Sequence, residues 1–148
     1  MCYHEPVIPR IVMDTNVYIA ALLSASGNNR AVLRSCLSGV AKPLMGAALL
    51  HEYEEVMQRE SIFRKCPLTV AERQTLLEAF LSVCEWVKVY YLWRPNLRDE
   101  GDNHLVELAV AGSADMIVTN NTKDFQTKEL RFPNLKIITP TQFIHHQL

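Results

Sequence analysis

Residues 10–17 read RIVMDTNV, and this stretch decides the expected fold. Three consecutive apolar residues favour a buried strand, which we expect to begin near Arg10. The strand ends at Asp14, Thr15 and Asn16, three residue types that favour the start of a helix. We therefore expect a helix over residues 17–24, directly after the strand.

The same alternation of strand and helix continues along the chain. Further strands are expected over residues 43–45, 86–90, 114–119 and 136–139, and further helices over 31–37, 47–59, 69–84, 102–111 and 141–146. Thr69 and Glu72 have the spacing of a capping box, and Gly112 is the expected C-cap of the helix before it. This pattern favours a three-layer α/β/α fold with a central parallel sheet.

Length and composition predict an ordinary globular domain. The 148 residues suit a single domain over 1–148, and 49% hydrophobic with 21% charged residues can form a core without disulfides. The net charge of −1 gives no overall basic field, so binding to nucleic acid would need a local patch.

The location is predicted from the N-terminus and the cysteines. The chain has no signal-peptide pattern and no apolar run long enough to cross a membrane. The thiols of Cys2, Cys36, Cys66 and Cys84 are scattered and form no C-x-x-C pair. We expect reduced thiols in a cytoplasmic protein that does not contact a membrane.

Four acidic residues are candidates for one site: Asp14, Glu52, Asp102 and Asp124. Ligands of parallel α/β sheets gather at the carboxyl ends of strands, where Asp14 and Asp124 are expected. Each acid also has an ordinary structural explanation, as a helix cap, a turn residue or part of a solvated helix face. A cluster of these carboxylates would repel itself unless a cation neutralised it, and oxygen ligands without Cys or His suit Mg²⁺ or Mn²⁺.

The motifs around these acids resemble those of PIN domains, the fold of VapC-like toxins. IVMDTNV (11–17) is similar to the opening motif, and LHEYEEV (50–56) to the segment with the second acid, here Glu52. DEGDNH (99–104) resembles the third motif, and ADMIVT (114–119) with Asn121, Asp124 and Phe125 resembles the closing one. The resemblance covers about residues 10–141.

The resemblance implies a function as well as a fold. It implies Mg²⁺ or Mn²⁺, endonucleolytic cleavage of RNA that leaves a 5′-phosphate and a 3′-hydroxyl, frequent homodimers and inhibition by a cognate antitoxin. Asp14, Glu52 and Asp102 would then hold the cation, and Asp124 would complete the pocket. We expect five further residues to orient the carboxylates or water from outside the ligand set, namely Thr15, Asn16, Asp99, Thr119 and Asn121.

One residue departs from the family pattern. Asn121 stands where many members carry Asp, and its side chain offers a carbonyl oxygen without a charge. This predicts one tightly bound cation and a second that depends on substrate. It also supports an alternative, in which the chain is a catalytically weakened PIN domain that binds RNA or acts as a scaffold.

A second alternative is a phosphatase of the haloacid-dehalogenase class. That class also places an Asp after its first strand, but usually needs a second Asp two residues later, where this chain has Asn16. Basic residues that could contact phosphates are scattered, and a solvated surface is the ordinary explanation for each: Arg30, Arg34, Arg94, Arg98 and Lys123. No role is predicted for His51 or His104.

Overall fold

The computed structural model describes residues 7–24, 27–89, 100–125 and 132–146, although not the side chains of residues 100–103, 124 and 146. The elements are, in chain order, β1 (Arg10–Met13), α1 (Thr15–Leu23), α2 (Asn28–Leu37), β2 (Lys42–Met45), α3 (Ala47–Met57), the 3₁₀ turn η1 (Glu60–Phe63), α4 (Val70–Val83), β3 (Glu85–Trp86), α5 (Glu100–Ala111), β4 (Met116–Val118), the 3₁₀ turn η3 (Thr122–Phe125), β5 (Lys136–Ile138) and α7 (Pro140–His146). Within the described residues, no helix is both long and apolar enough to cross a membrane.

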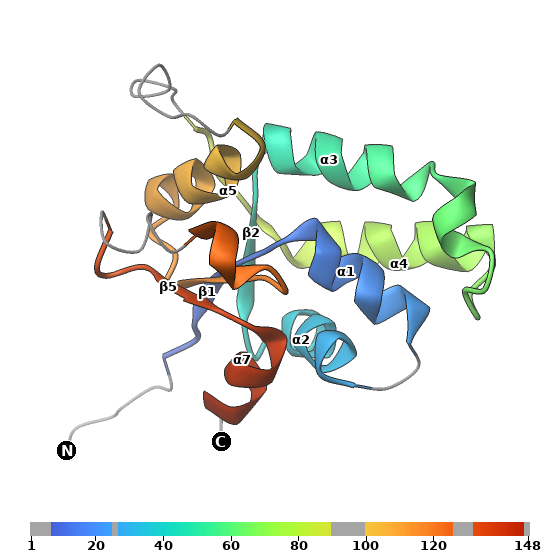
Figure 1. The fold of residues 1–148 in the computed structure, drawn as a ribbon, viewed down its shortest axis with the longest axis horizontal. Coiled ribbons are helices and arrows are strands. Elements are labelled where there is room, and N and C mark those ends of the chain that lie inside the picture. The colour runs from blue at the N-terminus through green and yellow to red at the C-terminus, as the bar shows by residue number, and fades with distance from the viewer. Residues whose placement is uncertain (1–6, 25–26, 90–99, 126–131, 147–148) are drawn as a thin grey trace.

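The strands of the described residues form one parallel sheet in the order β3-β2-β1-β4-β5. Helix α5 packs against β1, β2 and β4, and α4 packs against β2. In Figure 1, α5 lies to one side of the strands, and α1, α2 and α4 lie to the other. The predicted α/β fold with a parallel sheet flanked by helices is therefore confirmed.

The centre of the core is β1, because the sheet covers both of its edges and helices cover both of its faces. Ile11, Val12 and Met13 are each at most 1% exposed. Continuous apolar residues are typical of parallel strands that are buried on both faces. This burial fixes the position of the polar residues that follow β1.

Most element boundaries differ from the predictions by a few residues, and two of these differences have a physical reason that matters here. The strand expected over 86–90 is only Glu85–Trp86, because β2, with which it pairs, ends at Met45 opposite Trp86. Helix α5 begins at Glu100, so that Asp102 is its third residue and not its first. An acidic first turn is favoured by the helix dipole, which explains why the helix includes these residues.

Gly112 is the C-cap of α5, as predicted, but it is not the left-handed residue that ends the helix. That residue is Ser113, with φ 54°. The Ala114 N–H donates to the Ala109 carbonyl at 2.8 Å and the Ser113 N–H to the Val110 carbonyl at 3.3 Å, as in a Schellman motif. Gly112 is required for packing instead, since a Cβ there would lie 2.6 Å from Leu44 Cδ1.

Candidate functional site

Asp14 lies at the carboxyl end of β1, at the N-cap position of α1, but its side chain makes no capping hydrogen bond. Its Oδ2 accepts instead from Thr119 Oγ1 at 2.9 Å and from Asn16 Nδ2 at 3.3 Å. The residue is 8% exposed. Helix capping therefore does not explain why a carboxylate is present here.

Polar side chains connect Asp14 to the loop after β4. Thr119 is fully buried, and its Oγ1 also accepts from the backbone N–H of Asn121 at 3.0 Å. The Asn16 Oδ1 accepts from the Asn120 N–H at 3.3 Å. These contacts hold the residues that follow β1 and β4 together at one edge of the sheet.

Glu52 lies in the second turn of α3, and each of its carboxylate oxygens has a partner. Thr15 Oγ1 donates to Oε1 at 2.8 Å, and His104 Nε2 lies 2.7 Å from Oε2. The Glu52 side chain is 37% exposed. Thr15, which donates to Glu52, directly follows Asp14 in the chain. It directly precedes Asn16, which donates to Asp14.

The surroundings of Glu52 favour its ionised form. Partial burial raises the pKa of this carboxyl, but hydrogen bonds from His104 and Thr15 lower it by more, so the pKa lies below its ordinary value. Glu52 is therefore an anion at neutral pH. In contrast, Glu54 and Glu55 of the same helix are exposed, and Glu55 pairs with Arg59.

The backbone of Asp102 reaches the same region. Asp102 precedes His104 by two residues on α5, and Figure 1 shows the amino-terminal ends of α3 and α5 side by side. Asp124 lies in η3, beyond the end of β4. The side chains of Asp102 and Asp124, and the whole of Asp99, lie outside the described residues. Among the side chains that are described, no three His, Cys, Asp or Glu residues form a group that could hold a metal ion.

Sequence reasoning missed His104, for which it predicted no role. The structure places its ring against Glu52, with only 11% of the side chain exposed. One signal was present, because His104 is four residues before the buried Leu108 and so lies on the same face of α5. His51, in contrast, is 82% exposed and faces Glu55.

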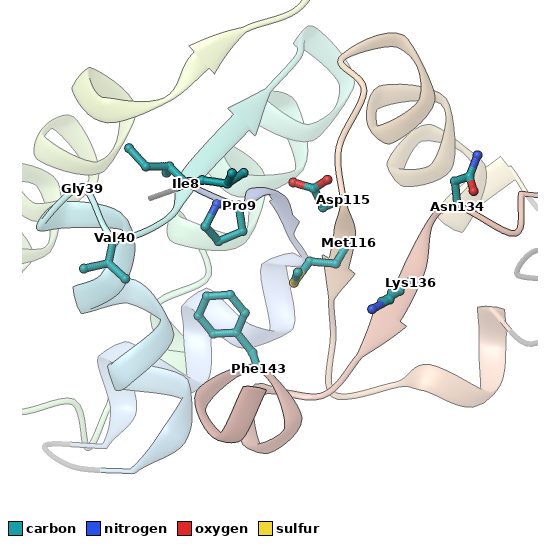
Figure 2. A pocket seen from close by; sticks show the side chains of 10 residues that line it. Ile8, Pro9, Gly39, Val40, Asp115, Met116, Asn134, Lys136 and Phe143 are labelled. Carbon is teal, nitrogen blue, oxygen red and sulfur yellow. The ribbon is translucent and has the colours of Figure 1, made fainter. Parts of the chain in front are cut away.

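A cavity of about 730 Å³ lies at the opposite edge of the sheet. Figure 2 shows Pro9, Met116 and Phe143 grouped at its centre, with Asp115 at the start of β4. The Asp115 Oδ2 accepts from the Arg10 N–H at 2.9 Å, so this acid joins two strand beginnings. The cavity lies at the amino-terminal ends of the strands, whereas Asp14 and Thr119 lie at their carboxyl ends. The cavity is therefore not part of the candidate site.

Three of the five basic residues that could contact phosphates lie within the described part of the chain. Arg34 and Lys123 are exposed, and Arg30 donates to the Ser24 carbonyl at 2.9 Å. Arg94 and Arg98 lie outside the described residues.

The comparisons with known proteins agree with this fold. A model of the PIN domain matches residues 10–123. A solved structure of VapBC2 from Rickettsia felis, bound to a DNA fragment from their promoter, matches with a TM-score of 0.58 and 20% identity. The match covers 88% of this chain and 98% of that chain, and at this identity it shows a shared fold. No curated protein matches the chain.

Proposed function

Because the chain belongs to the PIN-domain family, we propose that it is a metal-dependent endoribonuclease that hydrolyses RNA phosphodiester bonds. The observation that carries the proposal is the placement of two acids from distant segments. Asp14 follows β1, and Glu52 of α3 accepts a hydrogen bond from Thr15, the next residue after Asp14. Both carboxylates are held by hydrogen-bond donors, as expected for acids that bind a cation.

The donor chemistry fits Mg²⁺ or Mn²⁺. Carboxylate oxygens are hard ligands, and the lowered pKa of Glu52 keeps that group charged. Cys36 and Cys84 do not offer a thiolate as a soft ligand, because burial raises the pKa of each thiol to about 12. We propose that the cation is held by Asp14, Glu52 and Asp102, and that Asp124 completes the pocket.

When bound, such a cation acts as a Lewis acid that activates water and neutralises charge on the phosphodiester. The residues of the chain provide orientation. Thr119 and Asn16 hold the Asp14 carboxylate, and Thr15 holds that of Glu52. Asp99 and Asn121 are proposed to support the same group from outside the ligand set.

We further propose that the chain is the toxin of a type II toxin–antitoxin pair, acting in the cytoplasm as a homodimer that a cognate antitoxin inhibits. The fold shared with VapBC2 of Rickettsia felis supports this biological role. Expression of the chain alone should arrest growth, and co-expression of a small protein from the adjacent reading frame should relieve the arrest. Light scattering of the purified chain tests the dimer.

The chemical proposal is tested by RNA cleavage with Mn²⁺, with and without EDTA. Asp14→Asn should abolish cleavage, whereas the matched control Asp115→Asn should retain it, because Asp115 lies at the other edge of the sheet. Unchanged cleavage by Asp14→Asn would contradict the nuclease assignment. RNA binding by a wild-type protein that never cleaves with Mn²⁺ would favour the weakened domain instead.

A further inference from the structure

The carboxylate of Glu52 is clamped between two helices. Thr15, in the first turn of α1, bonds Oε1 at 2.8 Å, and His104, in α5, lies within 2.7 Å of Oε2. An ionised carboxylate only accepts hydrogen bonds, so both partners act as donors. A carboxylate with a donor on each oxygen has a fixed plane, and one acceptor position on each oxygen remains for a cation or water.

The ring of His104 is confined by its surroundings. The space beside it, bordered by Gly46, Leu49, Val89 and Leu108, holds only about 10 Å³. That volume is at the lower limit for a single water molecule, so the ring cannot turn into this space. The His104 side chain is only 11% exposed, and its Nε2 lies against the Glu52 carboxylate.

The two ring nitrogens of His104 differ in their contacts. The Nδ1 atom of His104 is buried, and none of the described residues forms a hydrogen bond with it. Among the described residues, the hydrogen bond that the His104 ring forms is therefore the one with Glu52.

The position of His104 in the chain links Glu52 to another proposed ligand. His104 follows Asp102 by two residues on α5, just as Thr15 follows Asp14 by one residue. The two donors that hold Glu52 thus lie within two residues of two other acids of the proposed set. Each contact fixes both the Glu52 carboxylate and the segment that carries a further acid.

We propose that His104 is a positioning residue that fixes the Glu52 carboxylate, and with it the first turn of α5, for binding of the divalent cation. This inference rests on the proposed nuclease function. His104 does not ligate the cation in this proposal, because its Nε2 is occupied by Glu52. Its contribution is to remove the rotational freedom that Glu52 would otherwise lose on binding.

The test uses three variants of the full chain. His104→Leu removes the donor and keeps an apolar side chain in the buried position. His104→Gln keeps an N–H donor at a similar reach and is the rescue variant. His51→Leu is the matched control, because His51 is on the same helix as Glu52, next to it in sequence, and is exposed.

Mn²⁺ affinity is measured by calorimetry, and RNA cleavage by steady-state kinetics, after circular dichroism has shown that each variant is folded. We expect His104→Leu to weaken Mn²⁺ binding by roughly 10- to 100-fold, as for residues that orient metal ligands. We expect His104→Gln to recover most of the loss and His51→Leu to bind normally. The cleavage rate at saturating Mn²⁺ should fall less than the rate at limiting Mn²⁺.

The outcomes separate this inference from the function on which it rests. If Glu52→Gln weakens Mn²⁺ binding and folded His104→Leu does not, the positioning role is wrong and the nuclease proposal stands. If His104→Gln binds as poorly as His104→Leu, the donor is not what matters, and the positioning role is again wrong. If the wild-type protein binds no Mn²⁺, both proposals fail.

Discussion

The hydroxyl of Thr119 donates a hydrogen bond of 2.9 Å to Oδ2 of Asp14, although the two residues are 105 positions apart in the sequence. Thr119 is fully buried at the end of β4, and β4 pairs directly with β1. The register of this pair brings the hydroxyl to the carboxylate. The same atom accepts the Asn121 N–H, so Thr119 supports both Asp14 and the polar turn after β4.

We predict that Thr119→Val weakens Mn²⁺ binding by about 10- to 100-fold, because valine has the shape of threonine but cannot donate to Asp14. Thr119→Ser keeps the hydroxyl and should retain most of the affinity. Calorimetric titration with Mn²⁺ measures both variants. Equal affinities for the valine and serine variants would show that the hydrogen bond to Asp14 does not prepare it for a cation.

Features with a local cause could be predicted from the sequence. The capping box is one, since Thr69 and Glu72 bond reciprocally at the start of α4 as expected. The buried strand before Asp14 is another, because its apolar run is continuous. The length of β3 could not be predicted in this way, since it depends on where the partner strand β2 ends.

The candidate site also combines features that could be predicted from local sequence with features that could not. The sequence indicated Asp14 and Glu52 as candidates, but could not decide between a helix cap and a ligand for Asp14. That decision needed Thr119, which only strand pairing brings close. His104 was missed because its partner Glu52 is 52 positions away, and no pattern within α5 specifies that contact.

The second prediction concerns two buried tyrosines whose hydroxyls differ. Tyr53 donates to the Met13 carbonyl at 2.7 Å, next to Asp14, whereas the Tyr18 hydroxyl is buried without a hydrogen bond to any described residue. Tyr53→Phe should lower the free energy of unfolding by about 1 kcal/mol, the typical net value of one hydrogen bond.

Tyr18→Phe is the control for this prediction, since it removes a hydroxyl of the same kind in the same aromatic cluster. Removing a buried polar group that has no partner should leave stability unchanged or raise it. Urea denaturation measures both variants. A larger loss for Tyr18→Phe than for Tyr53→Phe would contradict this account of the two hydroxyls.

The third prediction concerns pH and the ion pair between Arg10 and Glu85, which joins β1 to the edge strand β3. Hydrogen bonds from Arg10 lower the pKa of Glu85 in the folded protein. A lowered carboxyl pKa stabilises the fold at pH values above the pKa of the unfolded chain, about 4.3, and this stabilisation is lost as the pH falls through the folded value.

We therefore expect Glu85→Gln to be less stable than the wild type near pH 7, with a difference that shrinks steadily below about pH 5. Thermal unfolding at a series of pH values measures this difference. Glu78→Gln, at an exposed position of α4, should show no such trend. A difference between Glu85→Gln and the wild type that persists at low pH would assign the effect to packing and not to charge.

The final prediction uses two neighbouring residues at the end of α5 that should respond in opposite directions. Ser113 has φ 54°, a left-handed conformation that costs a residue with a Cβ about 1 kcal/mol relative to glycine, so Ser113→Gly should stabilise the protein by about that amount.

Gly112 has no such backbone requirement, but a Cβ there would lie 2.6 Å from Leu44 Cδ1 and 3.0 Å from Val87 Cγ2. Gly112→Ala should therefore destabilise the protein by about 1–3 kcal/mol through overpacking, although alanine normally favours a helix. Urea denaturation of both variants checks the signs, and a stabilised Gly112→Ala would mean that α5 can move away from β2 at little cost.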